Sequence, residues 1–288
     1  MTLLHVIILA VVQGLAELLP VSSSAHVIVA EKLMGMDPTA PETTLLLVML
    51  HTGTMFAVIV YFWRRWSEAF FQSAETFKQF FIAIVLATAV TGVVGGGLTK
   101  AIEKVAMRGE SQAWVEELFG RLDLIAAALA AAGILILIAG LKEKKAGGKK
   151  SDAPRSDLVK ATWIGAVQGL CLPFRGFSRS GATISTGMLV GVPKLRAEDF
   201  SFALAVVLTP VAVGREVLRL LKTHHGESLK SLAPSMTLSL LGAAFAFLAG
   251  LLALKWLSRW LEEGRWYLFG IYCLVAAVVV GFLYHAGY

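Results

Sequence analysis

The sequence predicts an all-α integral membrane protein, and three observations lead to that class. First, 57% of the 288 residues are hydrophobic and only 16% are charged, whereas a soluble domain carries about 25% charged residues. Second, several apolar stretches are long enough to cross the hydrocarbon core of a bilayer, which takes about 20 residues as a helix. Third, two further apolar stretches are interrupted near their middle by Pro, Gly, Ser and charged residues.

Six uninterrupted apolar stretches are predicted to be transmembrane helices. They are Thr44–Phe62, Phe80–Leu98, Leu122–Leu141, Phe200–Leu221, Ser235–Leu254 and Trp266–His285. The two interrupted regions, residues 3–34 and 161–190, are predicted to be re-entrant hairpins of broken helices. Non-helical backbone at membrane depth needs protein or a water-filled cavity to satisfy its polar groups, so we expect the hairpin tips to lie inside the bundle.

The two interrupted regions share a short sequence, which indicates an internal duplication. A shift of 155 residues places Gln13 on Gln168 and Gly14 on Gly169. The same shift also pairs Val12 with Val167, Leu15 with Leu170 and Ser23 with Ser178. We therefore predict an inverted repeat with a first half over residues 1–141, a basic cytoplasmic linker over 142–160, and a second half over 161–288.

The net charge of +6 fits the positive-inside rule better than nucleic-acid binding, because the basic residues cluster between apolar segments. With the two hairpins re-entrant, the loops on one side hold 15 Lys and Arg residues and those on the other hold 9. We place the richer side, which includes residues 142–160, in the cytoplasm. Both termini are then outside, the halves are inverted, and the two hairpin tips meet in one cavity.

The first hairpin tip gathers groups that suit phosphate hydrolysis. Gln13 and Glu17 are four residues apart, on one face of a helix that Pro20 should end. The serines at 22–24 can cap a second half-helix starting near Ala25, with His26 in its first turn. A carboxylate in the membrane is costly and usually functional, which favours Glu17 as a reacting group. For the serines capping alone is an alternative, and for His26 a hydrogen bond across helices.

The second tip supplies cations and hydroxyls. A guanidinium stays charged and binds phosphate through a planar fork. Arg179 is flanked by serines and is the preferred phosphate ligand, whereas Arg175 could instead extend to the membrane interface. The hydroxyl residues of this tip are Ser178, Ser180 and Thr183.

His51 lies inside a predicted span and has two equally good interpretations. It can line the cavity, or it can belong to a helix contact made through Gly53 and the neighbouring threonines. Cys171 and Cys273 both lie in apolar stretches and are interpreted as small core residues without a disulfide or metal role.

At these residues the chain resembles the undecaprenyl pyrophosphate phosphatase family, also called the bacitracin-resistance protein family, over essentially its whole length. One motif comprises Gln13, Glu17, Pro20, Val21, Ser22, Ser23 and His26, and the other comprises Gly176, Ser178, Arg179, Ser180, Gly181 and Thr183. The run Phe62–Arg65 is similar too. The chain departs from the family pattern where Arg175 replaces a Pro and Ala25 a common Gly.

The resemblance implies a hydrolase of the bacterial inner (plasma) membrane that converts undecaprenyl diphosphate to undecaprenyl phosphate and inorganic phosphate. It also implies a site open to the outer face, a divalent cation such as Mg²⁺ or Ca²⁺, and resistance to bacitracin. Recycling of this carrier serves peptidoglycan synthesis and cell shape. The implied partners are the lipid substrate and membrane lipids, not nucleic acid; the sequence is compatible with a homodimer.

The roles expected for the site residues follow from the same motifs. Glu17 would hold the metal or act as base, and Arg179 would clamp the phosphate. His26 would transfer protons or act as nucleophile, and Ser23 or water are the other nucleophile candidates. The expected substrate-binding residues are Gln13, Ser22, Ser178, Ser180 and Thr183. The alternative function is a transporter or flippase of the polyprenyl phosphate lipid, since inverted hairpins also build transporters.

Overall fold

The computed structural model describes residues 1–38, 40–106, 120–146, 157–223, 233–262 and 265–288. In these residues the chain is helical and forms no strand. The helices are α1 (Leu3–Leu18), α2 (Ser23–Leu33), α3 (Pro41–Phe70), α4 (Ala74–Ala106), α5 (Leu122–Ala146), α6 (Asp157–Cys171), α7 (Arg179–Leu189), α8 (Lys194–Thr223), α9 (Ala233–Glu262) and α10 (Tyr267–His285).

Six of these helices are long and apolar enough to cross a membrane, which confirms the predicted number of spans. They are α3, α4, α5, α8, α9 and α10. The start of α8 was predicted too late, because the helix begins at Lys194 rather than Phe200. Its first turns carry Asp199, whose Oδ1 accepts a hydrogen bond of 2.5 Å from Arg65 Nε on α3. This ion pair stabilises polar turns that hydropathy alone assigns to a loop.

The first interrupted region forms the helix pair α1 and α2. As predicted, α1 ends ahead of Pro20, with Leu19 in an extended conformation at φ −82° and ψ 147°. The second helix begins at Ser23, two residues earlier than predicted, directly after Ser22. Ser22 has a φ of +69°. Residues other than glycine rarely adopt such a value, and those that do are found mainly at functional sites.

The second interrupted region repeats this construction with α6 and α7. The residue before α7 is Ser178, which also has a positive φ, at +53°. Its Oγ accepts a hydrogen bond of 3.2 Å from the backbone N–H of Gly181 and caps the helix. Each hairpin therefore changes direction through a serine in the left-handed region, and each second helix starts directly after that serine.

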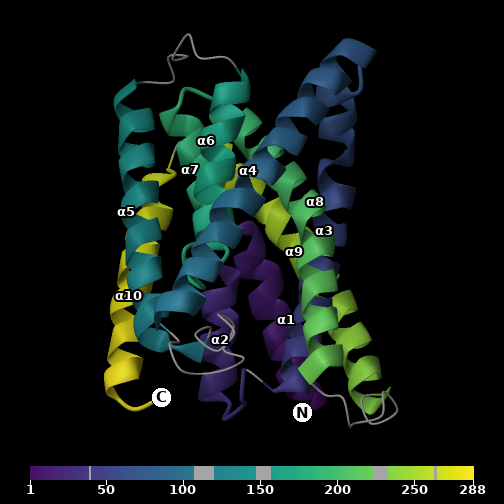
Figure 1. Ribbon diagram of the computed structural model, residues 1–288, viewed down its shortest axis with the longest axis vertical. Helices are drawn as coiled ribbons and strands as arrows, with labels where there is room; N and C mark the ends of the chain where they lie inside the picture. Colours follow the sequence, from purple (N-terminus) through teal and green to yellow (C-terminus); the bar gives the residue numbers. More distant parts are fainter. Residues whose placement is uncertain (39, 107–119, 147–156, 224–232, 263–264) are drawn as a thin grey trace.

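The two hairpins approach one another from opposite ends of the bundle and meet near its middle (Figure 1). Both chain termini lie at the end from which α1 and α2 start and finish (Figure 1). This arrangement agrees with an inverted repeat, although the division at 1–141 and 161–288 stays a prediction. The re-entrant position of the hairpins relative to a bilayer also stays a prediction. Residues 147–156 of the predicted linker lie outside the described residues.

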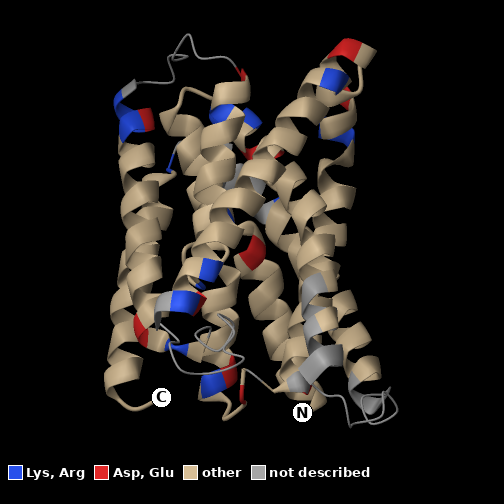
Figure 2. Cartoon of the chain, viewed as in Figure 1, with Lys and Arg blue, Asp and Glu red and all other residues tan. Residues whose placement is uncertain are grey.

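Charged side chains are distributed as expected for a bundle in a membrane. Figure 2 shows most Lys, Arg, Asp and Glu residues toward the two ends of the helices, with a small group near the level of the hairpin tips. Because a charge in the hydrocarbon region is costly, this internal group marks the part of the fold where a function is expected.

The repeated Gln-Gly pair has a packing role in both halves. A Cβ added to Gly14 of α1 would lie 2.5 Å from Ala249 Cβ and 2.9 Å from the backbone N of Gly250, both on α9. A Cβ added to Gly169 of α6 would lie 2.8 Å from Val94 Cβ and 2.9 Å from the backbone N of Gly95, both on α4. Each hairpin thus packs tightly on a long helix of the opposite half, a contact that only glycine permits.

Replacing Gly14 by Ala is predicted to destabilise the protein by about 1–3 kcal/mol, because the added methyl group overlaps the α9 backbone. The measurement is the thermal unfolding midpoint in detergent, which should fall by several degrees. Gly97→Ala is the matched control, since nothing lies within 4 Å of a Cβ at that helical position. Equal midpoints for the two variants would contradict the close contact between α1 and α9.

Candidate active site between the hairpin tips

A cavity of about 420 Å³ lies where the two hairpin tips meet. Both tips contribute polar residues to its wall, including Glu17, Ser23, Arg179 and Ser180. The helices α3 and α8 add apolar side chains such as Leu47, Val48 and Leu208. A polar centre inside apolar walls suits a ligand with an anionic head and a hydrocarbon tail.

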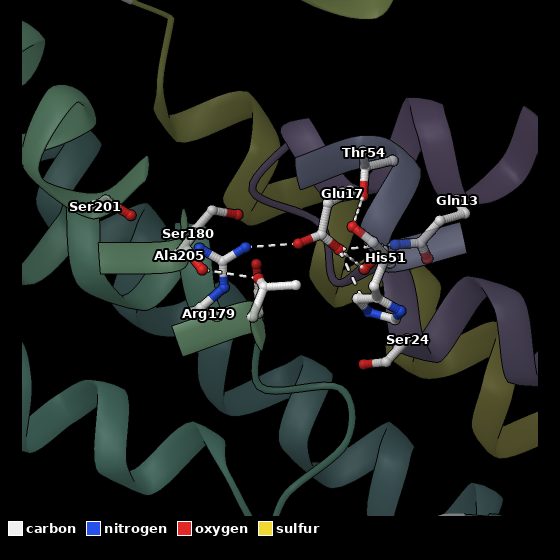
Figure 3. A network of polar contacts seen from close by, with 12 residues as sticks. Gln13, Glu17, Ser24, His51, Thr54, Arg179, Ser180, Ser201 and Ala205 are labelled. Atoms are coloured by element: carbon white, nitrogen blue, oxygen red, sulfur yellow. Dashed lines mark hydrogen bonds and ion pairs between the residues drawn. The ribbon is translucent and has the colours of Figure 1, made fainter. Parts of the chain in front are cut away.

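Glu17 is the centre of the polar network. Its Oε1 accepts a hydrogen bond of 2.5 Å from Arg179 Nη2, so the carboxylate of α1 and the guanidinium of α7 form an ion pair between the halves. Its Oε2 accepts a hydrogen bond from the Ser23 hydroxyl and another, 3.1 Å long, from Gln13 Nε2. Figure 3 shows Arg179 reaching Glu17 from the side opposite to Gln13 and His51.

Ser23 and Arg179 are the first residues of α2 and α7. At the tips the structural correspondence therefore differs by one residue from the predicted repeat, which paired Ser23 with Ser178. The amino terminus of a helix carries unsatisfied N–H groups and a partial positive charge, which favour an anion. Two such termini therefore face one cavity, one presenting a hydroxyl and the other a guanidinium.

Arg179 has donor capacity left for a ligand. Its Nη2 is bound to Glu17, while its Nη1 is buried and has no partner among the described residues. An unsatisfied buried donor on a charged group is costly, so this atom favours an anion in the cavity.

His51 is the histidine of this site. Its Nε2 lies 3.8 Å from Glu17 Oε2, and its Nδ1 lies 2.8 Å from the carbonyl oxygen of Leu47. Since a carbonyl only accepts, Nδ1 carries a proton, which leaves Nε2 to accept or donate toward Glu17. The structure supports both interpretations open from the sequence: His51 lines the cavity, and a Cβ added to the neighbouring Gly53 would overlap the backbone carbonyl of Ala243 on α9.

His26 is not among the residues that line this cavity, so its expected catalytic role stays a prediction. The cavity face of α2 carries Ser24, Ile28 and Glu31, at helical spacings of four and three residues. His26 is two residues from Ser24, or about 200° around the helix. Its Nδ1 lies 2.8 Å from Ser22 O and its Nε2 lies 2.7 Å from the Tyr272 hydroxyl of α10.

The other expected substrate-binding residues divide into two groups. Ser22, Ser178 and Ser180 line the cavity. Gln13 is fully buried behind it and orients Glu17. Thr183 is fully buried as well, and its hydroxyl lies 2.6 Å from Ser201 Oγ, so it connects α7 to α8.

The structure adds residues that the motifs did not identify. Gln168 lines the cavity from α6 and donates a hydrogen bond of 3.1 Å to the Thr91 hydroxyl. Its alignment with Gln13 in the internal repeat was the one available signal. Glu31 also lines the cavity, yet its side chain is only 1% exposed. The sequence did not identify Glu31 as a site residue because it lies at the polar end of an apolar stretch, where a charged residue is expected.

Comparison with known proteins places this geometry in a family. Residues 6–279 match the family model described as bacitracin resistance protein BacA. The chain is 58% identical over 283 residues to undecaprenyl-diphosphatase 2 of Acinetobacter baylyi, covering 97% of each chain. It is 33% identical over 290 residues to undecaprenyl-diphosphatase 2 of Burkholderia orbicola, covering 96% of this chain and 95% of the relative.

A third relative, undecaprenyl-diphosphatase of Desulfosudis oleivorans, is 33% identical over 287 residues, with 93% of this chain and 94% of the relative covered. These matches span both hairpins, all six long helices and the cavity between them. The chain therefore belongs to the bacitracin resistance protein BacA family.

Proposed function

We propose that the cavity between the hairpin tips hydrolyses undecaprenyl diphosphate to undecaprenyl phosphate and inorganic phosphate. The observation that carries the proposal is the contact of Glu17 with both Ser23 and Arg179. This arrangement combines a base, a hydroxyl nucleophile and a phosphate-binding cation. Family membership and the names of the relatives supply the substrate and agree with bacitracin resistance.

Ser23 is the nucleophile that the hydrogen bonds favour over His26, because only Ser23 donates to the Glu17 carboxylate. In the first step Glu17 accepts the Ser23 proton while Oγ bonds to the terminal phosphorus. The bridging P–O bond breaks, and its electron pair leaves on the phosphate of the lipid. Arg179 stabilises the negative charge on the terminal phosphoryl oxygens, where charge is greatest in the transition state.

In the second step a water molecule hydrolyses the phosphoserine. Glu17 has passed its proton to the departing lipid phosphate and accepts a proton from the water as the water oxygen attacks phosphorus. The P–Oγ bond breaks, and Glu17 gives the proton taken from the water to Oγ, which yields inorganic phosphate and free Ser23. His51, 3.8 Å from Glu17, is placed to exchange protons with this carboxylate between steps.

These residues could hold a divalent cation such as Mg²⁺ only together with the phosphate groups of the substrate. The described residues contain no cluster of three or more His, Cys, Asp or Glu side chains. Glu17 is one carboxylate, and Gln13 Oε1 beside it is buried without a partner. Mg²⁺ is often held by one or two carboxylates together with substrate phosphates. Glu17 and Gln13 would hold the ion, and it would neutralise phosphate charge.

The chain is a multi-pass membrane protein with six helices of spanning length. The inner membrane, with the cavity open to the outer face, is the location that fits this chemistry, because the lipid tail stays in the bilayer while the diphosphate enters the cavity. The apolar side chains of α3 and α8 that line the cavity can accompany the first part of the isoprenoid chain.

Glu17→Gln is predicted to lower the rate of phosphate release by a factor of about 10² to 10⁴, because the amide keeps the shape but cannot take a proton. The experiment measures inorganic phosphate released from a prenyl diphosphate by purified protein in detergent, over a range of Mg²⁺ concentrations. Wild-type protein that releases no phosphate would favour a transporter. Full activity of Glu17→Gln would remove Glu17 from the mechanism.

His51→Asn is predicted to lower kcat by at least about tenfold, since it removes a proton-exchanging group beside Glu17. His26→Asn should change kcat by less than about threefold, because His26 contacts Tyr272 instead of the cavity. The measurement is steady-state kinetics of both variants at equal thermal stability. An inactive His26→Asn together with an active His51→Asn would reverse the assignment.

We predict that the carboxyl terminus lies outside the cell and that the connection between α3 and α4 lies in the cytoplasm. Single cysteines at the exposed positions Gln72 and Tyr288, in a background with Cys171 and Cys273 replaced by Ser, can be labelled with a membrane-impermeant maleimide. In spheroplasts Tyr288→Cys should react at once, and Gln72→Cys only after permeabilisation. The opposite labelling pattern would exclude the predicted orientation.

A further inference from the structure

The cavity wall contains a second acidic residue and a second basic residue that the hydrolytic mechanism does not use. Of the described residues that line it, four are Asp, Glu, Lys or Arg: Glu17, Glu31, Arg175 and Arg179. Glu17 and Arg179 are in direct contact at the reacting centre. Glu31 and Arg175 belong to the same wall and have no part in the steps above.

Arg175 lines the same cavity as the reacting centre. It is in the connection between α6 and α7, four residues before Arg179. Its charge acts electrostatically on both Glu31 and His51. Because His51 is 3.8 Å from Glu17, Arg175 is a neighbour of the site where the terminal phosphate reacts.

Glu31 shares the cavity wall with this arginine. Its side chain is 1% exposed, and a nearby cation favours the charged form of such a buried carboxyl group. Glu31 is eight residues after Ser23 on α2, about 12 Å along the helix axis. The two carboxylates of the cavity are therefore far apart, and each has an arginine as its electrostatic partner. This pairing contradicts the alternative in which Arg175 extends to the membrane interface.

A diphosphate needs more positive charge than Arg179 alone offers. Arg179 is already bound to Glu17 through one of its terminal nitrogens. It faces the terminal phosphate, which is attacked by Ser23. The phosphate attached to the lipid must then lie beside that centre, on the side from which the lipid enters, and an arginine binds such a group by two parallel hydrogen bonds.

We propose that Arg175, oriented by Glu31, forms a second phosphate subsite that binds the phosphate remaining on the prenyl lipid. This inference rests on the proposed function and assigns its second subsite. The subsite holds the lipid monophosphate before and after cleavage, so it determines affinity for the substrate and for the lipid product, while Arg179 determines affinity for inorganic phosphate.

The test is calorimetric binding of two probes to the full-length protein in detergent, a short-chain prenyl monophosphate and inorganic phosphate. Arg175→Ala should raise the Kd for the prenyl monophosphate by about 10- to 100-fold, the loss expected for a charge-assisted hydrogen bond. Its Kd for inorganic phosphate should change by less than about threefold. Arg179→Lys should show the reverse order, with the larger loss for inorganic phosphate.

Two further variants separate binding from folding. Arg175→Lys keeps the charge but loses the planar fork, so its Kd for prenyl monophosphate should lie between wild type and Arg175→Ala. Lys32→Ala removes a cation next to Glu31 in sequence that does not line the cavity, and it should bind both probes as the wild type does.

The subsite is excluded if Arg175→Ala, with an unchanged unfolding midpoint, binds prenyl monophosphate as tightly as the wild type. It is also excluded if that variant loses affinity for both probes equally, because one shared site would then bind both. Absence of phosphate release by the wild type would instead contradict the proposed hydrolysis, and the binding experiment would still decide whether Arg175 holds a prenyl phosphate.

Discussion

The ion pair between Glu17 and Arg179 joins the two hairpin tips inside the bundle, and the positions of the surrounding side chains depend on it. Gln13, Ser23 and His51 are all arranged around the same carboxylate. Removing one partner of a buried ion pair costs about 3–5 kcal/mol, because the other charge stays buried without compensation. The substrate-free site is therefore held in a neutral, ordered state by groups that also react.

The same pair constrains which ligands can enter. A phosphate that binds Arg179 Nη1 shares the guanidinium with Glu17, and in the proposed mechanism this carboxylate accepts the Ser23 proton. Binding of the anion and activation of the base are thus linked through one arginine. A neutral head group has no negative charge that could pair with the Arg179 guanidinium. The cavity therefore selects among ligands by their charge first and by their shape second.

Much of the fold could be predicted from the sequence, because hydropathy and helix breakers act locally. The six spans and the end of α1 before Pro20 follow from such local rules, which also placed the start of α2 within two residues. The long-range ion pair between Arg65 and Asp199 does not, and the start of α8 was misplaced for that reason.

For the site, the motifs identified Glu17, Ser23 and Arg179, which the structure brings together. The sequence could not predict the direction in which each of these side chains points. His26 and Ser24 are two residues apart on α2, but one turns toward α10 and the other toward the cavity. His51 comes from a separate helix, α3, and reaches Glu17 only through tertiary packing. A sequence motif identifies polar residues that are close to one another in one segment. It does not predict which of their side chains will face the cavity and which will be covered by a neighbouring helix.

The crossed packing of the hairpins has a consequence for ancestry. The helix α1 rests on α9, and α6 rests on α4, so each predicted half covers the first hairpin helix of the other. Neither half buries its own glycine surface, and an ancestor of half this length would have needed a second copy in the opposite orientation. Such a chain must insert into the membrane in both orientations. This requires nearly equal numbers of basic residues in the loops on its two sides.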